Sequence, residues 1–112
     1  MSKVTNLIIS FSIGEDEAAR VEEINMFHNN GRGFKIVSAD FESVSDVDGK
    51  ERKRWYGGSK CLETPLYIGA YNHLDIQGLE EHLNSIEWGE PENVQIFLKE
   101  QDSDKFKLIE LR

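Results

Sequence analysis

The chain has 112 residues, of which 38% are hydrophobic and 30% are charged, and its formal net charge is −8. This composition suits one domain with a small core, and no part of the chain resembles a disordered tract or a low-complexity linker. The acidic balance opposes nucleic acid and anionic membranes as direct partners and favours basic ones. Residues 1–56 carry eight basic and ten acidic side chains, whereas residues 57–112 carry five and eleven, so the excess of acid lies mainly in the second half.

The N-terminal third alternates between the period of a strand and that of a helix. Residues 5–14 place an apolar side chain at every second position, which predicts a strand. Residues 15–31 change to the helical period, with acids in the first turn, where the helix dipole favours them. We expect this helix to end at the Asn-Asn-Gly sequence of residues 29–31, because these residue types accept the left-handed conformation that closes many helices.

Residues 33–57 are expected to form an antiparallel hairpin. In the first strand, residues 33–44, apolar side chains occupy both odd and even positions, so they would point to both faces of the strand. A bulge, or burial of both faces, would explain this pattern. An Asp-Gly turn signal follows, and we expect the chain to return as a strand over residues 50–57.

The stretch KRWYGGSKC, residues 53–61, gathers cations, aromatic rings and glycines in an acidic chain. Its spacing differs from that of a P-loop, and no helix is expected after it. Its cations and rings have the chemistry of a nucleic-acid patch, but the acidity of the whole chain opposes that function. We interpret the stretch as the end of a hairpin strand bent at its paired glycines, with candidate anchors of a protein contact at Arg54, Trp55 and Tyr56.

The second half has the order strand, helix and hairpin. Residues 65–72 predict a strand, and Asp75 is the expected N-cap of the helix that follows. The helix carries the clearest apolar stripe in the chain, at Ile76, Leu79, Leu83 and Ile86, and should stop at Gly89 and Pro91. Residues 93–100 and 105–111 are expected to pair as an antiparallel hairpin.

This order predicts a single α+β domain over residues 1–112, built from two βαββ units at about residues 5–57 and 65–111. Two helices on one face of a mainly antiparallel sheet is the economical packing, and a ferredoxin-like fold with extra strands is a near neighbour. Such a sheet leaves its second face for solvent, for a partner or for a second copy of the chain.

A second unusual stretch is YIGAYNHLD, in the strand and turn before the second helix. Gly69 and Ala70 inside an aromatic strand leave room for a ligand, a helix packed closely or another backbone. Tyr67 and Tyr71 have the same parity, so both rings share one face of the strand. If that face carries no helices, the two tyrosines would join Trp55 in a binding surface.

The spacing of the polar residues contains no catalytic or metal-binding constellation, and we expect no cofactor and no metal. The one cysteine, Cys61, allows no internal disulfide and favours a reducing compartment. The N-terminal apolar run is interrupted by serines and followed by acids, which indicates a first strand rather than a signal peptide, so a cytoplasmic protein is expected.

The leading hypothesis is a non-enzymatic acidic protein-binding module that occludes a basic partner, with carboxylates meeting cations and aromatic rings as anchors. In size, acidity, single-domain build and lack of an export signal, the chain is similar to bacterial immunity proteins, which neutralise a basic toxin, often a nuclease. An inhibitor that mimics nucleic acid fits the charge equally well. The candidate partner-binding acids are Glu80, Glu81, Glu87, Glu90, Glu92, Asp102 and Asp104.

Two alternatives remain open. One is a small-molecule or enzymatic domain with a site built from Tyr67, Tyr71, Cys61 and His73. The other is a homo-oligomeric structural or regulatory subunit that pairs through the open sheet face, which would make the protein a homodimer.

Overall fold

The computed structural model describes residues 3–39 and 64–111. In chain order the elements are β1 (Val4–Ser10), α1 (Glu17–Ile24), β2 (His28–Asn29), β3 (Arg32–Gly33), β4 (Val37–Ser38), β5 (Leu66–Asn72), α2 (Ile76–Ser85), the 3-10 turn η1 (Pro91–Asn93), β6 (Gln95–Glu100) and β7 (Lys107–Glu110). The α+β class with a mainly antiparallel sheet, expected from the order of elements, is confirmed.

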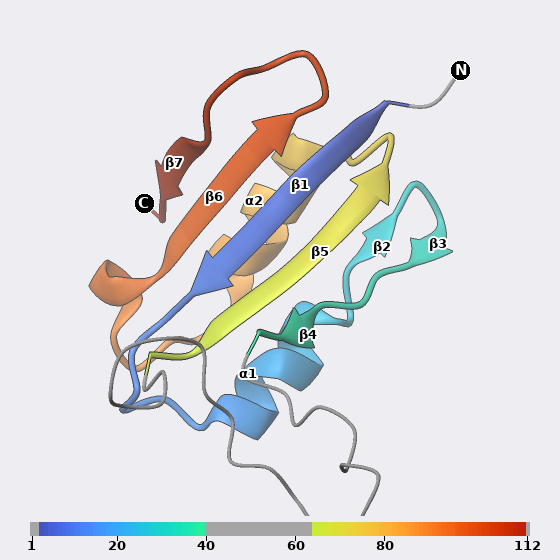
Figure 1. Ribbon diagram of the computed structural model, residues 1–112. Helices are drawn as coiled ribbons and strands as arrows, with labels where there is room; N and C mark the ends of the chain where they lie inside the picture. The colour runs from blue at the N-terminus through green and yellow to red at the C-terminus, as the bar shows by residue number, and fades with distance from the viewer. Residues whose placement is uncertain (1–2, 40–63, 112) are drawn as a thin grey trace, which may run out of the picture.

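Five strands form one antiparallel sheet in the order β4–β5–β1–β6–β7, and β2 and β3 form a separate hairpin. Figure 1 shows α2 behind the central strands of the sheet and α1 beside β4, at the lower end of the sheet in this view. The opposite side of these strands faces the viewer, and neither α1 nor α2 covers it.

The hydrophobic core lies between the sheet and the two helices. Along β1 the side chains of Leu7 and Ile9 are fully buried, whereas Asn6 is exposed and Ile8 is partly exposed, as a period of two requires. The buried apolar side chains are Leu7, Ile9, Phe11, Ile24, Phe27, Phe34, Ile36, Tyr67, Leu79, Leu83, Val94, Ile96 and Leu98. The complete burial of one such large side chain stabilises the fold by about 1.5–3 kcal/mol.

Helix α1 is shorter than the sequence predicts at both ends. Its N-cap lies after the predicted start, and a hairpin turn replaces its predicted C-terminal end. The carboxylate of Asp16 accepts the backbone N–H of Ala19 at 3.2 Å, so Asp16 is the N-cap and Glu15 lies outside the helix. Asn30 and Gly31 do not stop the helix. They form the two-residue turn between β2 and β3, with φ values of 53° and 81°, and this Asn-Gly pair is a hairpin signal that the preceding helical period concealed.

Helix α2 begins as predicted and ends early. Asp75 is its N-cap and accepts the N–H of Gly78 at 3.1 Å. The helix stops at Ser85, ahead of the predicted Gly89. The indole of Trp88 turns back and donates at 2.8 Å to the carbonyl of Leu83, which also accepts the backbone N–H of Ile86 at 3.3 Å.

The strand predicted at residues 33–44 is described only to residue 39, and within it Val37 and Ser38 pair with β5. Phe34 and Ile36 point into the core, whereas Val37, of the opposite parity, is exposed. Burial on both faces therefore does not account for the mixed parity in this part of the strand. The rest of the predicted hairpin and the whole of the stretch KRWYGGSKC lie outside the described residues.

A buried carboxylate ties the segment before α1 to the segment after α2. The side chain of Glu15 is 1% exposed, and it accepts the backbone N–H groups of Gly89 at 3.0 Å and Glu90 at 2.7 Å. Arg20 donates to it through Nε at 2.9 Å and to Glu23 through a terminal nitrogen at 2.7 Å. Every oxygen of Glu15 thus has a donor, which offsets the cost of burying its charge.

Candidate functional site

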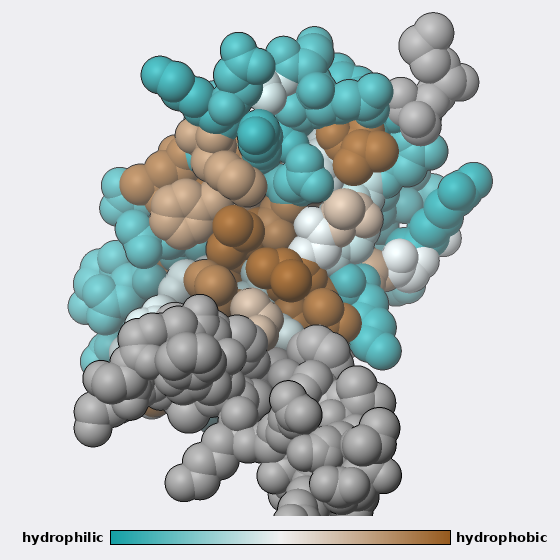
Figure 2. Space-filling view, viewed as in Figure 1, coloured by the Kyte–Doolittle hydropathy of each residue, from teal (hydrophilic) through white to brown (hydrophobic). Residues whose placement is uncertain are grey.

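The sheet face turned away from the helices carries a row of apolar side chains that crosses all five strands. Paired positions in the sheet register form this row, which consists of Val37, Ile68, Ile8, Phe97 and Leu108. Three of its members, one in each of β4, β5 and β7, are between 38% and 46% exposed. Figure 2 shows hydrophobic side chains gathered in the middle of this face. We call these five residues the apolar row.

A shallow hollow of about 450 Å³ lies beside the apolar row. Phe106, from the turn before β7, forms part of its wall, together with Ala70 of β5 and Asn6 of β1. Phe106 is itself exposed, so the apolar surface continues past the row. Large contiguous apolar patches on the surface of a protein are typical of interaction sites, so this surface is a candidate functional site.

Two charged side chains flank the apolar row on opposite sides. Lys99 follows Phe97 by two positions along β6, so it lies on the same face as the row. Glu110 lies two positions beyond Leu108 along β7, opposite Gln95, on the other side of the row. Among the described residues, neither charge takes part in an ion pair. The Nζ atom of Lys99 lies 5.8 Å from the ring centre of Phe106.

The seven candidate acids do not form one surface. They lie in three places: Glu80 and Glu81 on α2, Glu87, Glu90 and Glu92 between α2 and β6, and Asp102 and Asp104 in the turn after β6. The second and third groups are separated by the length of β6, six residues or about 20 Å. Of the three groups, the first two are adjacent along the chain.

Tyr67 and Tyr71 share a face, as their parity predicts, but it is the face covered by the helices. Tyr67 is buried and stacks on Phe11 with 5.7 Å between ring centres. Tyr71 stacks on Phe34 at 4.5 Å and donates its hydroxyl hydrogen to the carbonyl of Lys35. The condition under which the two tyrosines would join a binding surface is therefore not met.

The space that the sequence indicated at Gly69 is filled by the side chain of Tyr71. A Cβ atom on Gly69 would lie against the hydroxyl and ring of Tyr71, closer than atoms can approach without a shift. The glycine thus accommodates a ring from the same strand rather than a ligand or a helix. Ala70 points to the other face and lines the hollow beside the apolar row.

The phenol of Tyr71 should make stability sensitive to alkaline pH. Burial raises the pKa of Tyr71 from 10.0 to about 12. Since the folded state holds the proton more tightly than the unfolded chain, the contribution of Tyr71 to stability is complete below pH 10 and is lost as the pH rises through 12. Urea unfolding measured from about pH 9 to about pH 12 should show this loss in the native protein and a smaller one in Tyr71→Phe. Equal slopes in the two proteins would contradict it.

The residues of the alternative small-molecule site are not brought together by the described structure. Tyr67 lies in the core, and Cys61 is outside the described residues. His73 lies in the turn between β5 and α2, with a left-handed φ of 55°. Arg54, Trp55 and Tyr56, the predicted anchors of a protein contact, are also outside the described residues.

The sequence argument missed the apolar row, although a signal for it was present. Three apolar residues alternate in position with the buried residues of their strands and so point outward: Ile8, Ile68 and Phe97. Apolar residues at the outward-pointing positions of several strands would have indicated that the second face of the sheet is also apolar.

Within residues 3–39 and 64–111, no helix has the length and apolar character needed to span a membrane. The same residues contain no group of three or more His, Cys, Asp or Glu side chains placed to hold a metal ion. Comparison of the chain with protein-family models, with curated proteins and with solved structures found no match.

Proposed function

We propose that this protein is a non-enzymatic protein-binding module that acts as a homodimer, paired through the apolar row on the open face of its sheet. The observation that carries the proposal is that the row is continuous across five strands and partly exposed. Face-to-face packing of two sheets would bury it in the way that β-sandwiches bury their inner faces.

A second copy of the chain suits this face because the face is nearly neutral, although the whole chain carries a charge of −8. A two-fold axis parallel to the apolar row would place the rows of the two copies face to face. Residues on one side of the row in the first copy would then face residues on the other side of the row in the second copy. Lys99 of each copy would then approach Glu110 of the other. The two-fold symmetry produces this contact between opposite charges twice. The two contacts would favour this alignment of the two sheets over others.

Pairing through the sheet would leave the helices and the segment between α2 and β6 free to contact another protein. Glu81, Glu87 and Glu92 are exposed there, and none of them forms an ion pair with a described residue. These carboxylates support a basic protein as the further partner, bound by charge complementarity. An inhibitor of the immunity-protein type, which occludes a basic toxin or nuclease, belongs to this class, and a cytoplasmic location would suit it.

We also propose a ferredoxin-like core. The sheet order β4–β5–β1–β6, with α1 after β1 and α2 after β5, supports it, and β7 would be an added edge strand. The elements β5, α2, β6 and β7 make up one βαββ unit. The return strand that would complete the first unit falls within residues 40–63, outside the described residues.

The dimer is tested by the oligomeric state of the pure protein and of one disrupted variant. Light scattering and sedimentation equilibrium should give a dimer for the native chain and a monomer for Ile68→Lys, because a buried lysine without a partner is costly at an apolar interface. The matched control is Ile13→Lys. Ile13 is 72% exposed and lies after β1, outside the apolar row, so this variant should remain dimeric.

Circular dichroism should show that Ile68→Lys keeps its fold, since the substituted side chain is already exposed. Lys99→Glu should weaken the dimer by like-charge contact, and the double variant with Glu110→Lys should restore it. A native chain that is monomeric at every concentration, or an Ile68→Lys variant that dimerises as the native chain does, would overturn the proposal.

A further inference from the structure

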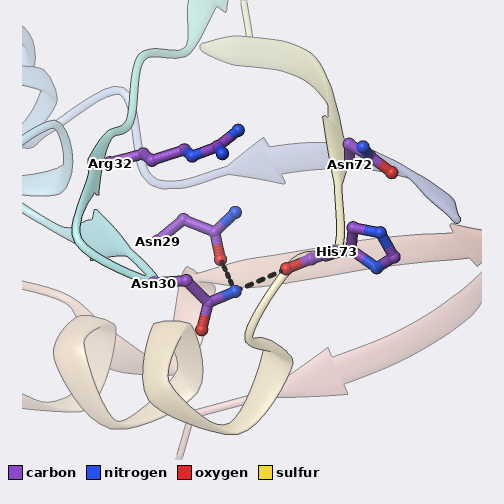
Figure 3. A pocket seen from close by; sticks show the side chains of 5 residues that line it. All are labelled: Asn29, Asn30, Arg32, Asn72 and His73. Carbon is purple, nitrogen blue, oxygen red and sulfur yellow. Dashed lines mark hydrogen bonds between the residues drawn. The ribbon is translucent and has the colours of Figure 1, made fainter. Parts of the chain in front are cut away.

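A polar pocket of about 280 Å³ lies where the β2–β3 hairpin meets the turn between β5 and α2 (Figure 3). Its lining consists of Asn29, Asn30, Arg32, Asn72 and His73. The five side chains come from two segments far apart in the sequence, and none of them is acidic, although the chain contains 21 acids. The pocket is separate from the apolar row.

Asn29 holds a buried hydrogen-bond donor toward this pocket. The residue is only 7% exposed, and its Oδ1 accepts the backbone N–H of Asp75 at 2.8 Å and Nδ2 of Asn30 at 3.4 Å. Because both contacts require an acceptor, the other terminal atom is the amide nitrogen, and Figure 3 shows it on the side where Arg32 lies. In the part of the chain that the structure describes, this nitrogen donates to no acceptor. A buried donor in this state is costly unless a water or a ligand accepts from it.

Two more donor groups line the same pocket. The guanidinium of Arg32 forms no ion pair with a described residue, so its five N–H groups remain available. The Oδ1 atom of Asn72 accepts the backbone N–H of Lys3 at 2.7 Å, which leaves the amide nitrogen of Asn72 as a donor. The pocket thus presents a full positive charge and two neutral amide donors.

The backbone around the pocket is held in place by direct contacts. Nδ2 of Asn30 donates to the carbonyl of His73 at 2.8 Å, which joins the hairpin to the turn before α2. Both residues have left-handed φ values, 53° and 55°, which surrounding contacts must maintain in residues other than glycine. The nearby carboxylate of Asp75 accepts the N–H of Gly78 in the first turn of α2. A site held in this way needs little ordering when a ligand binds.

We propose that this pocket binds a small oxyanion, namely the carboxylate or phosphate group of a small molecule. Arg32 binds two oxygens of the group through its parallel N–H donors, and the amides of Asn29 and Asn72 donate to the remaining lone pairs. Carboxylate and phosphate share the two properties that this lining selects, negative charge and oxygens that only accept hydrogen bonds.

The test is a titration of the ¹⁵N-labelled full chain, followed by NMR, with sodium phosphate and, separately, with sodium acetate at constant ionic strength. The side-chain amide signals of Asn29 and Asn72 should shift and saturate. Saturation with phosphate alone assigns a phosphate group, and saturation with acetate alone assigns a carboxylate; either result supports the site. Arg32→Gln should weaken binding by about tenfold or more, whereas Lys35→Gln, which removes another exposed cation of the same segment, should leave it unchanged.

Asn29→Asp provides a second variant, because it keeps the acceptor for Asp75 while it replaces the buried donor with a negatively charged oxygen. Binding should be lost in this variant, and the backbone spectrum should show that the fold is kept. Shifts that never saturate with either anion, or that are the same in the native chain and in Arg32→Gln, would overturn the proposal.

Discussion

Replacing Glu15 with alanine is expected to lower the free energy of unfolding by about 1–3 kcal/mol, the cost of leaving hydrogen-bond donors without their acceptor. The substitution would leave the N–H groups of Gly89 and Glu90 without their acceptor and would take one of two carboxylates from Arg20. These contacts join residues 74 and 75 positions apart, so their loss would separate the start of α1 from the end of α2. Urea unfolding followed by circular dichroism measures the change.

Acid should reproduce part of this loss in the native protein. Burial by itself would raise the pKa of Glu15, but the N–H donors of Gly89 and Glu90, together with Arg20, outweigh it and hold the pKa below 4.5. Because the folded pKa lies below the unfolded one, the stabilisation is complete above about pH 4.5 and is lost as the pH falls through the folded value. Glu15→Ala should lack this component of the acid-induced loss.

The matched control for this prediction is Glu22→Ala in α1. Glu22 is exposed and forms no ion pair with a described residue, so its removal should change the free energy of unfolding by no more than about 0.5 kcal/mol. If Glu15→Ala cost less than about 1 kcal/mol, its contacts would be worth no more than those of a surface pair, and the structural role assigned to Glu15 would be wrong.

Gly69→Ala is expected to lower the free energy of unfolding by about 1–3 kcal/mol, the range for overpacking a filled space. The new methyl group would displace the ring of Tyr71 from its stack on Phe34 and its hydroxyl from the carbonyl of Lys35. Ala70→Ser is the control, because Ala70 lies next in the strand but points to the open face. Thermal and urea unfolding at one protein concentration compare the two.

A double-mutant cycle identifies the cause of the Gly69 effect. Once Tyr71→Leu has removed the ring and hydroxyl, adding Gly69→Ala should cost much less than it does in the native chain, because the colliding atoms are gone. Strictly additive changes would show that the glycine is required by backbone conformation and not by the ring of Tyr71.

Local periodicity in the sequence was enough to predict most elements and the inward face of the sheet. The alternation along β1 and β6 and the stripe along α2 each identify buried residues, since the periods of strands and helices determine which side chains point the same way. Asp75 was predictable as an N-cap for the same reason, because its partner Gly78 is only three positions away.

Competing local signals produced the errors in the first half. The helical period of residues 15–31 masked the turn signal of Asn30 and Gly31, whose positive φ values belong to a hairpin and not to a helix end. In the second half, α2 ends at Ser85, and the indole of Trp88 donates back to a carbonyl of its last turn, a contact that no residue propensity encodes.

The candidate sites depended on tertiary structure throughout. The apolar row exists only because the register places one outward apolar residue of each strand beside the next. The polar pocket exists only because Asn29 and Asp75, 46 positions apart, are joined by a hydrogen bond. Spacing along a chain reports neighbours within a few residues, whereas a binding surface is assembled from residues that strand register and packing bring together. The sequence alone therefore determined the strongly periodic elements β1, β6 and α2, and the fold decided the sites.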